Sequence, residues 1–186
     1  AATCRKLLRT PAGRYAFEVQ SAPDREEWER FLALLRKTRK RSPISGLLVT
    51  VPADSLLKKS EDELSTYAQH LRGKVNDLMT RLEIVFPVYL AVTKVDLVEG
   101  FVDFFSRYPA NRVREAVGRT FADVRPASCV ATAGKTLDDL YDRLCSMSLG
   151  LMEEGEPGSP ARPYLMHPEE FHTLASRLKI FIEAMF

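Results

Sequence analysis

The chain has 186 residues, of which 45% are apolar and 28% are charged, a composition typical of one soluble globular domain with its own core. Its formal charge of +2 gives no reason to expect nucleic acid or a membrane as the partner of the whole chain. The cysteines form no C-x-x-C pair, which fits a reducing compartment better than a disulfide framework; they are Cys4, Cys129 and Cys145.

No run of residues approaches the roughly 18 apolar positions of a membrane span, and no signal-peptide pattern opens the chain. The sequence contains no internal repeat and no low-complexity segment. Because the first residue is not Met and the first segment reads like the middle of a protein, we expect a fragment of a longer protein.

The first elements expected are a short strand at Lys6–Leu8 and a helix that begins at about Pro23 and ends before Pro43. The helix has an apolar stripe at i, i+3, i+4 and i+7, formed by Trp28, Phe31, Leu32 and Leu35. Its end is strongly basic, with Arg36, Lys37, Arg39, Lys40 and Arg41. These cations predict a solvated helix end that complements the helix dipole; the alternative is a contact with anionic lipid headgroups.

A second strand is predicted at Ile44–Val51, closed by Pro52. Ser60–Glu63 has the pattern of a capping box and opens a long helix. One face of this helix is apolar, through Leu64, Tyr67, Leu71, Val75, Leu78, Met79 and Leu82. The strand that follows, Val85–Val92, is short, apolar and rich in β-branched and aromatic residues, which predicts burial on both faces.

Beyond this strand we expect a short aromatic helix over Leu97–Tyr108 and a second helix over Asn111–Val117, ended by Gly118–Phe121. Pro126–Gly134 is predicted to be irregular. The large aromatic residues are interpreted as core rather than as cofactor-stacking residues: Trp28, Phe101, Phe104 and Phe105. His70 lies off the apolar stripe of its helix, so we expect it to face solvent.

The last part is predicted to contain a helix capped by Thr136, a loop over Glu153–Pro163, a short strand at Tyr164–Met166 and a helix from Pro168. The final helix has an apolar stripe made of Phe171, Leu174, Leu178, Phe181, Ile182 and Met185. The triplet Gly134-Lys135-Thr136 is not interpreted as a phosphate-binding loop, because Cys129 stands where that loop requires a glycine.

Strands that alternate with helices in this way predict an α/β domain with a mainly parallel sheet covered by helices on both sides. In such sheets, ligands bind beyond the carboxyl ends of the strands, and Thr93-Lys94-Val95-Asp96 stands at one such end. These residues resemble the Asn-Lys-x-Asp base-recognition motif of Ras-like GTPases, with Thr93 in the place of Asn. The structural alternative is that Asp96 caps a helix begun by Leu97.

An ordered set of segments resembles the cytoplasmic domain of the IcmF/TssM family, the large inner-membrane protein of bacterial type VI secretion systems. The set runs over nearly the whole chain: Ala12–Tyr15, Trp28–Leu32, Gly46–Val51, Phe86–Tyr89, Thr93–Leu97, Gly100–Phe101, Phe104–Phe105, Gly118–Phe121 and Pro168–Phe171. The resemblance implies a partial Ras-like, P-loop NTPase-type fold of three layers. It also implies that residues 1–186 form one domain, the C-terminal two-thirds of a degenerate G domain, with an internal loop at 153–163.

Two departures from the family pattern bear on nucleotide binding. Thr10-Pro11 replaces the usual Asp-Thr, so the carboxylate that would hold Mg²⁺ is absent, although the N–H of Gly13 would still approach a γ-phosphate. The phosphate-binding loop, in members that have one, lies before the first residue here. The resemblance places His167 after the last predicted strand, where G domains carry a second base-contacting loop. The vestigial nucleotide residues implied are therefore Gly13, Thr93, Lys94, Asp96 and His167.

The resemblance implies a structural assembly module on the cytoplasmic side of the bacterial inner membrane, without catalysis in this chain. Its expected partners are other secretion-system subunits, from the inner membrane and the baseplate, and not nucleic acid. Two alternatives stay open: a GTP- or ATP-dependent switch that uses Mg²⁺ in the full-length parent, and an anionic-lipid-binding module. Because the first strand of the sheet would be missing, we expect a groove beside Leu47–Val51, or Lys6–Leu8 moving in to pair there.

Overall fold

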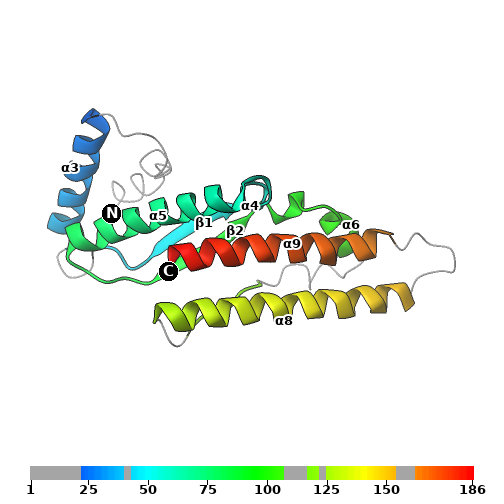
Figure 1. Cartoon of the computed structure of the whole chain (residues 1–186). Coiled ribbons are helices and arrows are strands. Elements are labelled where there is room, and N and C mark those ends of the chain that lie inside the picture. Colours follow the sequence, from blue (N-terminus) through cyan, green and yellow to red (C-terminus); the bar gives the residue numbers. More distant parts are fainter. Residues whose placement is uncertain (1–21, 40–42, 107–116, 122–124, 154–161) are drawn as a thin grey trace. The chain divides into compact units, whose positions relative to one another are not determined.

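The computed structural model describes residues 22–39, 43–106, 117–121, 125–153 and 162–186. These residues form a mixed α/β structure in which helices predominate (Figure 1). In chain order the elements are α3 (Ala22–Thr38), β1 (Leu47–Pro52), α4 (Ala53–Lys58), α5 (Glu61–Leu82), β2 (Val88–Thr93), η1 (Val95–Leu97), α6 (Phe101–Phe105), α8 (Pro126–Glu153) and α9 (Arg162–Met185). Lys6–Leu8 and the Ala12–Tyr15 segment lie outside the described residues.

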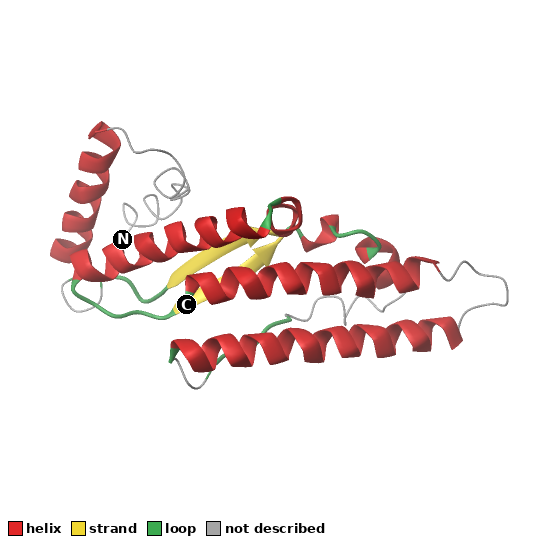
Figure 2. Cartoon of the chain, viewed as in Figure 1, coloured by secondary structure: helices red, strands yellow, loops and turns green. Residues whose placement is uncertain are grey.

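The described part of the chain contains one sheet, in which β1 and β2 run parallel (Figure 2). The Leu47 N–H donates to the carbonyl of Pro87 over 2.9 Å, which sets the register of the pair. Parallel strands require a long crossover, and α5 supplies it between β1 and β2. The predicted parallel arrangement of these strands is therefore confirmed, although β1 begins three residues later than the expected Ile44.

The chain divides into two compact units. Unit 1 comprises 1–48 and 70–89, and unit 2 comprises 49–69 and 90–186. In unit 1, α3 is tied to the end of α5 by an ion pair between Arg81 and Glu29 at 3.1 Å. A second ion pair joins Arg36 to Glu83 at 2.6 Å. The apolar side chains buried here come from α3, from one stripe of α5 and from the connection to β2: Leu32, then Leu71, Val75, Leu78 and Leu82, and Phe86.

Unit 2 is organised around α9, which packs against α8, α4 and α6. Its apolar stripe is buried as predicted, through Leu174, Leu178, Phe181, Ile182 and Met185. The Tyr67 ring lies 5.6 Å from the ring of Phe181, so the first half of α5 also contributes to this core. No helix among the described residues is long and apolar enough to cross a membrane.

The predicted capping box of α5 is present in both directions. The backbone N–H of Ser60 donates to the Glu63 carboxylate at 2.8 Å, and the N–H of Glu63 donates to the Ser60 hydroxyl at 3.3 Å. This arrangement holds the pKa of Glu63 below its usual value, chiefly through the hydrogen bond from the Ser60 backbone. The reciprocal bonds satisfy two N–H groups at the helix start that would otherwise lack a partner.

The prediction that Val85–Val92 is a strand buried on both faces is wrong in its burial. Strand β2 begins at Val88 and is half-buried, with Tyr89 55% exposed. Leu48 on β1 is 62% exposed. In the described part of the chain the sheet has two strands, so each strand has a neighbour on one side only and lacks the flanking side chains of a central strand.

The prediction for the C-terminal part is wrong at three points. Pro126–Gly134 is helical rather than irregular, because α8 begins at Pro126, where a proline needs no N–H partner. Thr136 is therefore inside a helix and is not its cap; its hydroxyl donates to the carbonyl of Thr132 at 2.7 Å. Tyr164–Met166 is also helical, since α9 begins at Arg162 and continues through Pro168.

Candidate functional site at the carboxyl ends of the strands

The strand ends of unit 2 bring two charged side chains together. Strand β1 leads directly into α4, which carries Asp54, and β2 leads into Lys94. Because the strands are parallel, both carboxyl ends lie at the same edge of the sheet. The Lys94 Nζ lies 3.8 Å from Asp54 Oδ1, with exposed side-chain fractions of 55% and 31%. Asp54 Oδ1 is itself buried without a hydrogen-bond partner, but the lysine is more than half exposed and the separation is long, so the contribution of the pair to stability is about 0–1 kcal/mol.

Lys94 adopts the left-handed backbone conformation, with φ 57° and ψ 34°. This conformation is uncommon for a residue with a side chain and turns the chain sharply after β2. The carbonyl of Lys94 accepts a hydrogen bond from the Leu97 N–H at 3.1 Å, which begins the 3-10 helix η1. Lys94 therefore occupies the N-cap position, and the predicted capping role of Asp96 is wrong because Asp96 lies inside η1.

Thr93, Lys94 and Asp96 are all exposed at this edge. A polar turn that presents a hydroxyl, an ammonium and a carboxylate to solvent is able to hydrogen-bond a polar ligand. Sequence reasoning missed Asp54, although a carboxylate just after a predicted strand was a signal that would have found it. The strand-end turn (Thr93–Asp96 together with Asp54) is the candidate functional site.

His167 lies elsewhere in unit 2, inside α9, and is 1% exposed. The predicted position in a loop after a last strand is therefore wrong. Its ring is surrounded by three aromatic rings, with centroid distances of 5.3 Å to Phe101, 5.1 Å to Phe104 and 5.4 Å to Phe105. Helix α9 extends beyond Pro168 toward its N-terminus, and this extension is favourable because it buries His167 among apolar rings.

The environment of His167 opposes its charged form. Burial lowers the pKa of His167, and a hydrogen bond with the backbone of Glu99 acts in the opposite direction without outweighing it. Its Nδ1 atom is buried without a hydrogen-bond partner. Gly100 explains how the two segments approach so closely, because a Cβ there would lie 3.0 Å from the His167 backbone nitrogen. Gly100 also has φ 77°, which glycine adopts without strain.

Comparison with known proteins identifies the family. The sequence profile of the IcmF-related N-terminal domain matches residues 21–186. The chain belongs to the IcmF-related family. It is 32% identical to the type VI secretion system component TssM1 of Pseudomonas aeruginosa, in an alignment that covers 97% of this chain and 17% of TssM1. The chain thus spans about a sixth of the length of that relative. No solved structure matches it.

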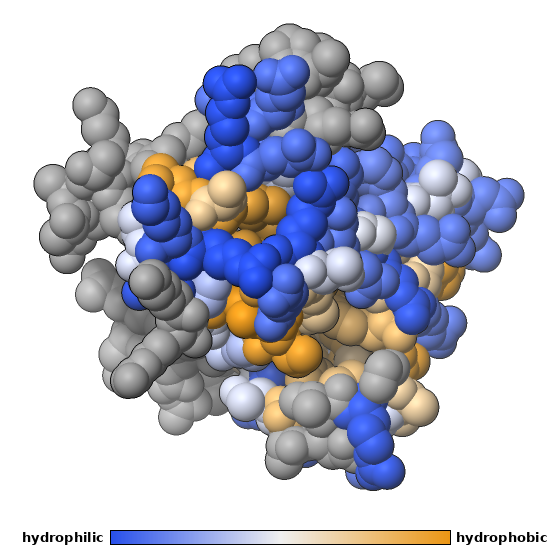
Figure 3. Space-filling model, turned by 90° about the vertical axis from the view of Figure 1, so that its left-hand side faces the viewer, coloured by the Kyte–Doolittle hydropathy of each residue, from blue (hydrophilic) through white to orange (hydrophobic). Residues whose placement is uncertain are grey.

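In this IcmF-related chain, part of the predicted lipid-binding segment has a different partner. Arg36 donates to Glu83 within unit 1. Lys37 and Arg39 are exposed, whereas Lys40 and Arg41 lie outside the described residues, as does Gly13. Figure 3 shows a face of the molecule on which apolar and hydrophilic side chains are interspersed. Lipid binding by the basic segment stays a prediction.

Other kinds of site receive no support in the described residues. The residues that precede the triplet Gly134-Lys135-Thr136 are helical from Pro126 onward, so the loop that would have to cradle the phosphates is absent at that position. Within the described ranges, no group of three His, Cys, Asp or Glu side chains is placed to hold a metal ion. Cys129 and Cys145, both in α8, are not joined in a disulfide bond.

Proposed function

We propose that this chain is a structural module that helps to assemble a type VI secretion complex on the cytoplasmic side of the bacterial inner membrane. The observation that carries the proposal is its similarity to TssM1 along 97% of its length. The partners proposed are other subunits of the secretion system, in the inner membrane and in the baseplate. Because the chain corresponds to only 17% of TssM1, the activity and contacts of the whole protein are part of this proposal.

The exposed apolar side chains support a role in protein contacts. Val85 is 92% exposed in unit 1, and in unit 2 Leu97, Leu149 and Leu165 are each more than half exposed. An exposed apolar side chain is removed from water when a protein partner covers it, which favours the contact. The ion pair between Lys94 and Asp54 engages the lysine within the chain, which favours a structural role for the strand-end turn.

Charge scanning of these side chains in the native protein, produced in its host, tests the proposal. The variants Val85→Glu, Leu97→Glu, Leu149→Glu and Leu165→Glu are compared with Thr50→Glu, a change at an exposed polar position. We expect at least one apolar variant to lose co-purification with the secretion subunits and to lose secretion, at unchanged protein level. If all of them behave like Thr50→Glu, the assembly role is refuted.

A nucleotide-dependent switch is the second candidate, because one observation favours it. The Thr93–Asp96 turn follows a parallel strand at its carboxyl end, which is where Ras-like domains read the base, and this supports descent from such a domain. The native protein is titrated with fluorescent GTP and ATP, alongside Asp96→Asn. Binding that this variant loses would favour the switch, whereas no binding at millimolar nucleotide would exclude it.

A further inference from the structure

Few apolar side chains attach helix α3 to the rest of unit 1. Among residues 26–38 of α3, Leu32 is the one apolar side chain that is buried, at 4% exposure. Leu34 is 48% exposed, and Trp28 and Phe31, whose rings stack at 5.6 Å, are half-buried. Helix α5, by contrast, has six buried apolar side chains: Leu64, Ala68, Leu71, Val75, Leu78 and Leu82. Apolar burial therefore contributes little to the attachment of α3.

Two ion pairs cross from α3 to the end of α5. Arg36 donates to the Glu83 carboxylate at 2.6 Å, and Arg81 donates to Glu29 at 3.1 Å. The four side chains are between 40% and 68% exposed, so water and dissolved salt reach both pairs. Asp77 positions Arg81 for the second pair, because both of its carboxylate oxygens accept from the Arg81 Nε, at 2.8 Å and 2.9 Å.

The backbone at Glu83 is strained. Glu83 follows α5 directly and has φ 54°, the left-handed conformation that glycine usually supplies just after a helix. Its N–H donates to the carbonyl of Thr80 at 3.4 Å, and the Ile84 N–H donates to that of Met79 at 3.2 Å, which is the Schellman pattern. A glutamate adopts this conformation less favourably than glycine, but it supplies the carboxylate that Arg36 contacts. Glu83 is therefore better suited to holding α3 than to ending α5.

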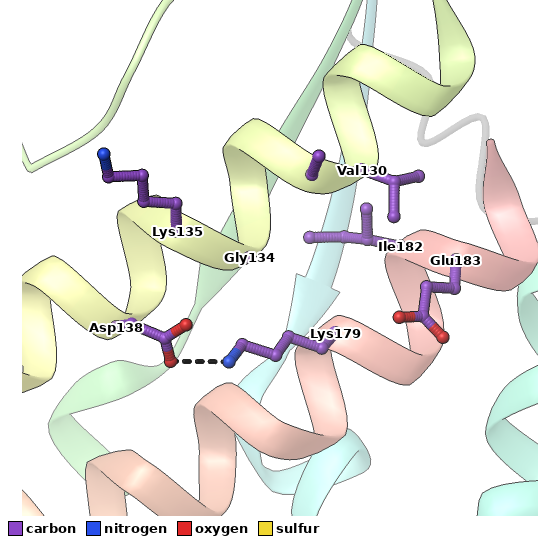
Figure 4. Close-up of a pocket in the computed structure, with 8 residues that line it drawn as sticks. Val130, Gly134, Lys135, Asp138, Lys179, Ile182 and Glu183 are labelled. Carbon is purple, nitrogen blue, oxygen red and sulfur yellow. Dashed lines mark hydrogen bonds and ion pairs between the residues drawn. The ribbon is translucent and has the colours of Figure 1, made fainter.

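The contact between α8 and α9 in unit 2 is built differently. Lys179 and Asp138 form an ion pair of 2.5 Å across it (Figure 4). The same groove is lined by the apolar side chains of Val130 and Ile182, and Ile182 belongs to the buried stripe of α9. An exposed ion pair adds little to a contact that already has a buried apolar stripe. For α3, whose apolar side chains are mostly half-buried or exposed, the charges contribute a larger share of the attachment.

We propose that α3 is a detachable arm whose attachment to α5 is controlled by ionic strength, with the Arg36–Glu83 and Arg81–Glu29 pairs as its latch. Salt screens both exposed pairs at once, whereas the buried stripe of α5 does not depend on charge. Once detached, the 17 residues of α3 lose most of their helical structure, because helices obtain most of their stability from tertiary packing. This inference depends on neither of the functions proposed above.

Hydrogen exchange of the native protein, measured by mass spectrometry on peptides from α3, tests the latch. Raising NaCl from about 0.1 M to about 1 M shortens the Debye length from about 10 Å to about 3 Å, so exchange in α3 should accelerate. Peptides from α9 are the internal reference and should keep their exchange rates. An equal response to salt in both helices, or no response in α3, would overturn the proposal.

Removal of single carboxylates separates the latch from other effects of salt. Glu29→Gln and Glu83→Gln should each accelerate exchange in α3 roughly two- to fivefold at low salt, the effect expected from the loss of one exposed pair. The control Glu26→Gln removes the 3.3 Å pair with Arg30 inside α3 and should have a smaller effect, since that pair does not reach α5. No acceleration in the first two variants, or an equal one in the control, would contradict the latch.

Charge exchange across the first pair gives an independent measurement. Glu83→Arg alone places two cations together, so α3 should exchange fast even at low salt. The double variant Arg36→Glu with Glu83→Arg restores opposite charges and should return α3 to about the protection of the wild type. Protection in α9 shows that each variant is folded. A folded double variant in which α3 stays unprotected would refute the role of the Arg36–Glu83 pair.

Discussion

The strand-end turn and the aromatic cluster around His167 are joined by the short stretch of chain from η1 to α6. They differ in exposure and in polarity. The turn is exposed, and the lysine of its Lys94–Asp54 ion pair is more than half exposed, although Asp54 Oδ1 is buried. In the aromatic cluster, three phenylalanine rings surround a histidine that is 1% exposed, and the ring of Phe104 is fully buried. The groups able to recognise a partner are thus separate from the groups that hold the backbone in place.

The largest effect is expected from Phe104→Ala, which removes a fully buried ring from the aromatic cluster. Large-to-small changes of this kind cost about 3–5 kcal/mol in the free energy of unfolding. Urea unfolding followed by circular dichroism measures the loss. Val102→Ala on the same helix is the matched control, because Val102 is 64% exposed and its truncation should cost little. Similar losses for both variants would mean that the cluster is not a core.

A second change tests the backbone contact that closes the cluster. Gly100→Ala places a Cβ 3.0 Å from the His167 nitrogen on a residue with φ 77°, so it should destabilise the protein by about 1–3 kcal/mol. Gly73→Ala in α5 is expected to have the opposite sign, stabilising by about 0.5–1 kcal/mol, since nothing lies near its Cβ. Thermal unfolding of both variants checks the two signs, and a neutral Gly100→Ala would contradict the close approach.

The cluster should also make stability depend on pH. Burial lowers the pKa of His167 in the folded state below its usual value of 6.5, so the unfolded chain binds a proton first as pH falls. Stability is therefore expected to decrease as pH falls through 6.5, and to be insensitive to this group above it. His167→Gln should remove that part of the pH dependence, whereas His70→Gln at an exposed position should leave it unchanged. An identical pH profile in His167→Gln would rule out this origin.

The smallest effect is expected in the strand-end turn. Asp54→Asn removes one charge of a pair whose lysine is more than half exposed and whose atoms lie 3.8 Å apart, so the free energy of unfolding should change by less than about 1 kcal/mol. A double-mutant cycle with Lys94→Met isolates the interaction between the two side chains. A coupling well above that value would show that the turn, like the cluster, supports the fold, and the contrast between the two regions would fail.

The long helices with a clear apolar period were predictable from the sequence. Helix α5 has both a capping box at Ser60 and Glu63 and an apolar stripe, so local and tertiary preferences agree. Helix α3 was also predictable: it was expected to begin at about Pro23 and to end before Pro43, and it runs from Ala22 to Thr38. The strand-end position of Thr93–Asp96 followed from an apolar run ending in a polar turn.

The rest depended on contacts that a sequence pattern does not contain. The start of α8 is rich in small residues without a stripe, and its Ala133 is buried in the fold. The start of α9 was predicted to be the end of a loop, at Pro163, and a short strand, Tyr164–Met166, with the helix starting only at Pro168, although His167 anchors that stretch in the aromatic cluster. Asp54 and Lys94 are far apart in the sequence, so only the parallel pairing of β1 and β2 brings them together.

Pro168 makes the first turn of α9 less stable than the rest of the helix. Because proline has no N–H, the carbonyl one turn earlier receives no helical hydrogen bond, and the helix preceding it is attached by fewer backbone bonds than the remainder. His167, immediately before Pro168, is held by the phenylalanine rings of α6. If α6 loosens, the first turn of α9 is therefore expected to unfold locally while the rest of the helix stays folded. Limited proteolysis would then cleave first in that turn.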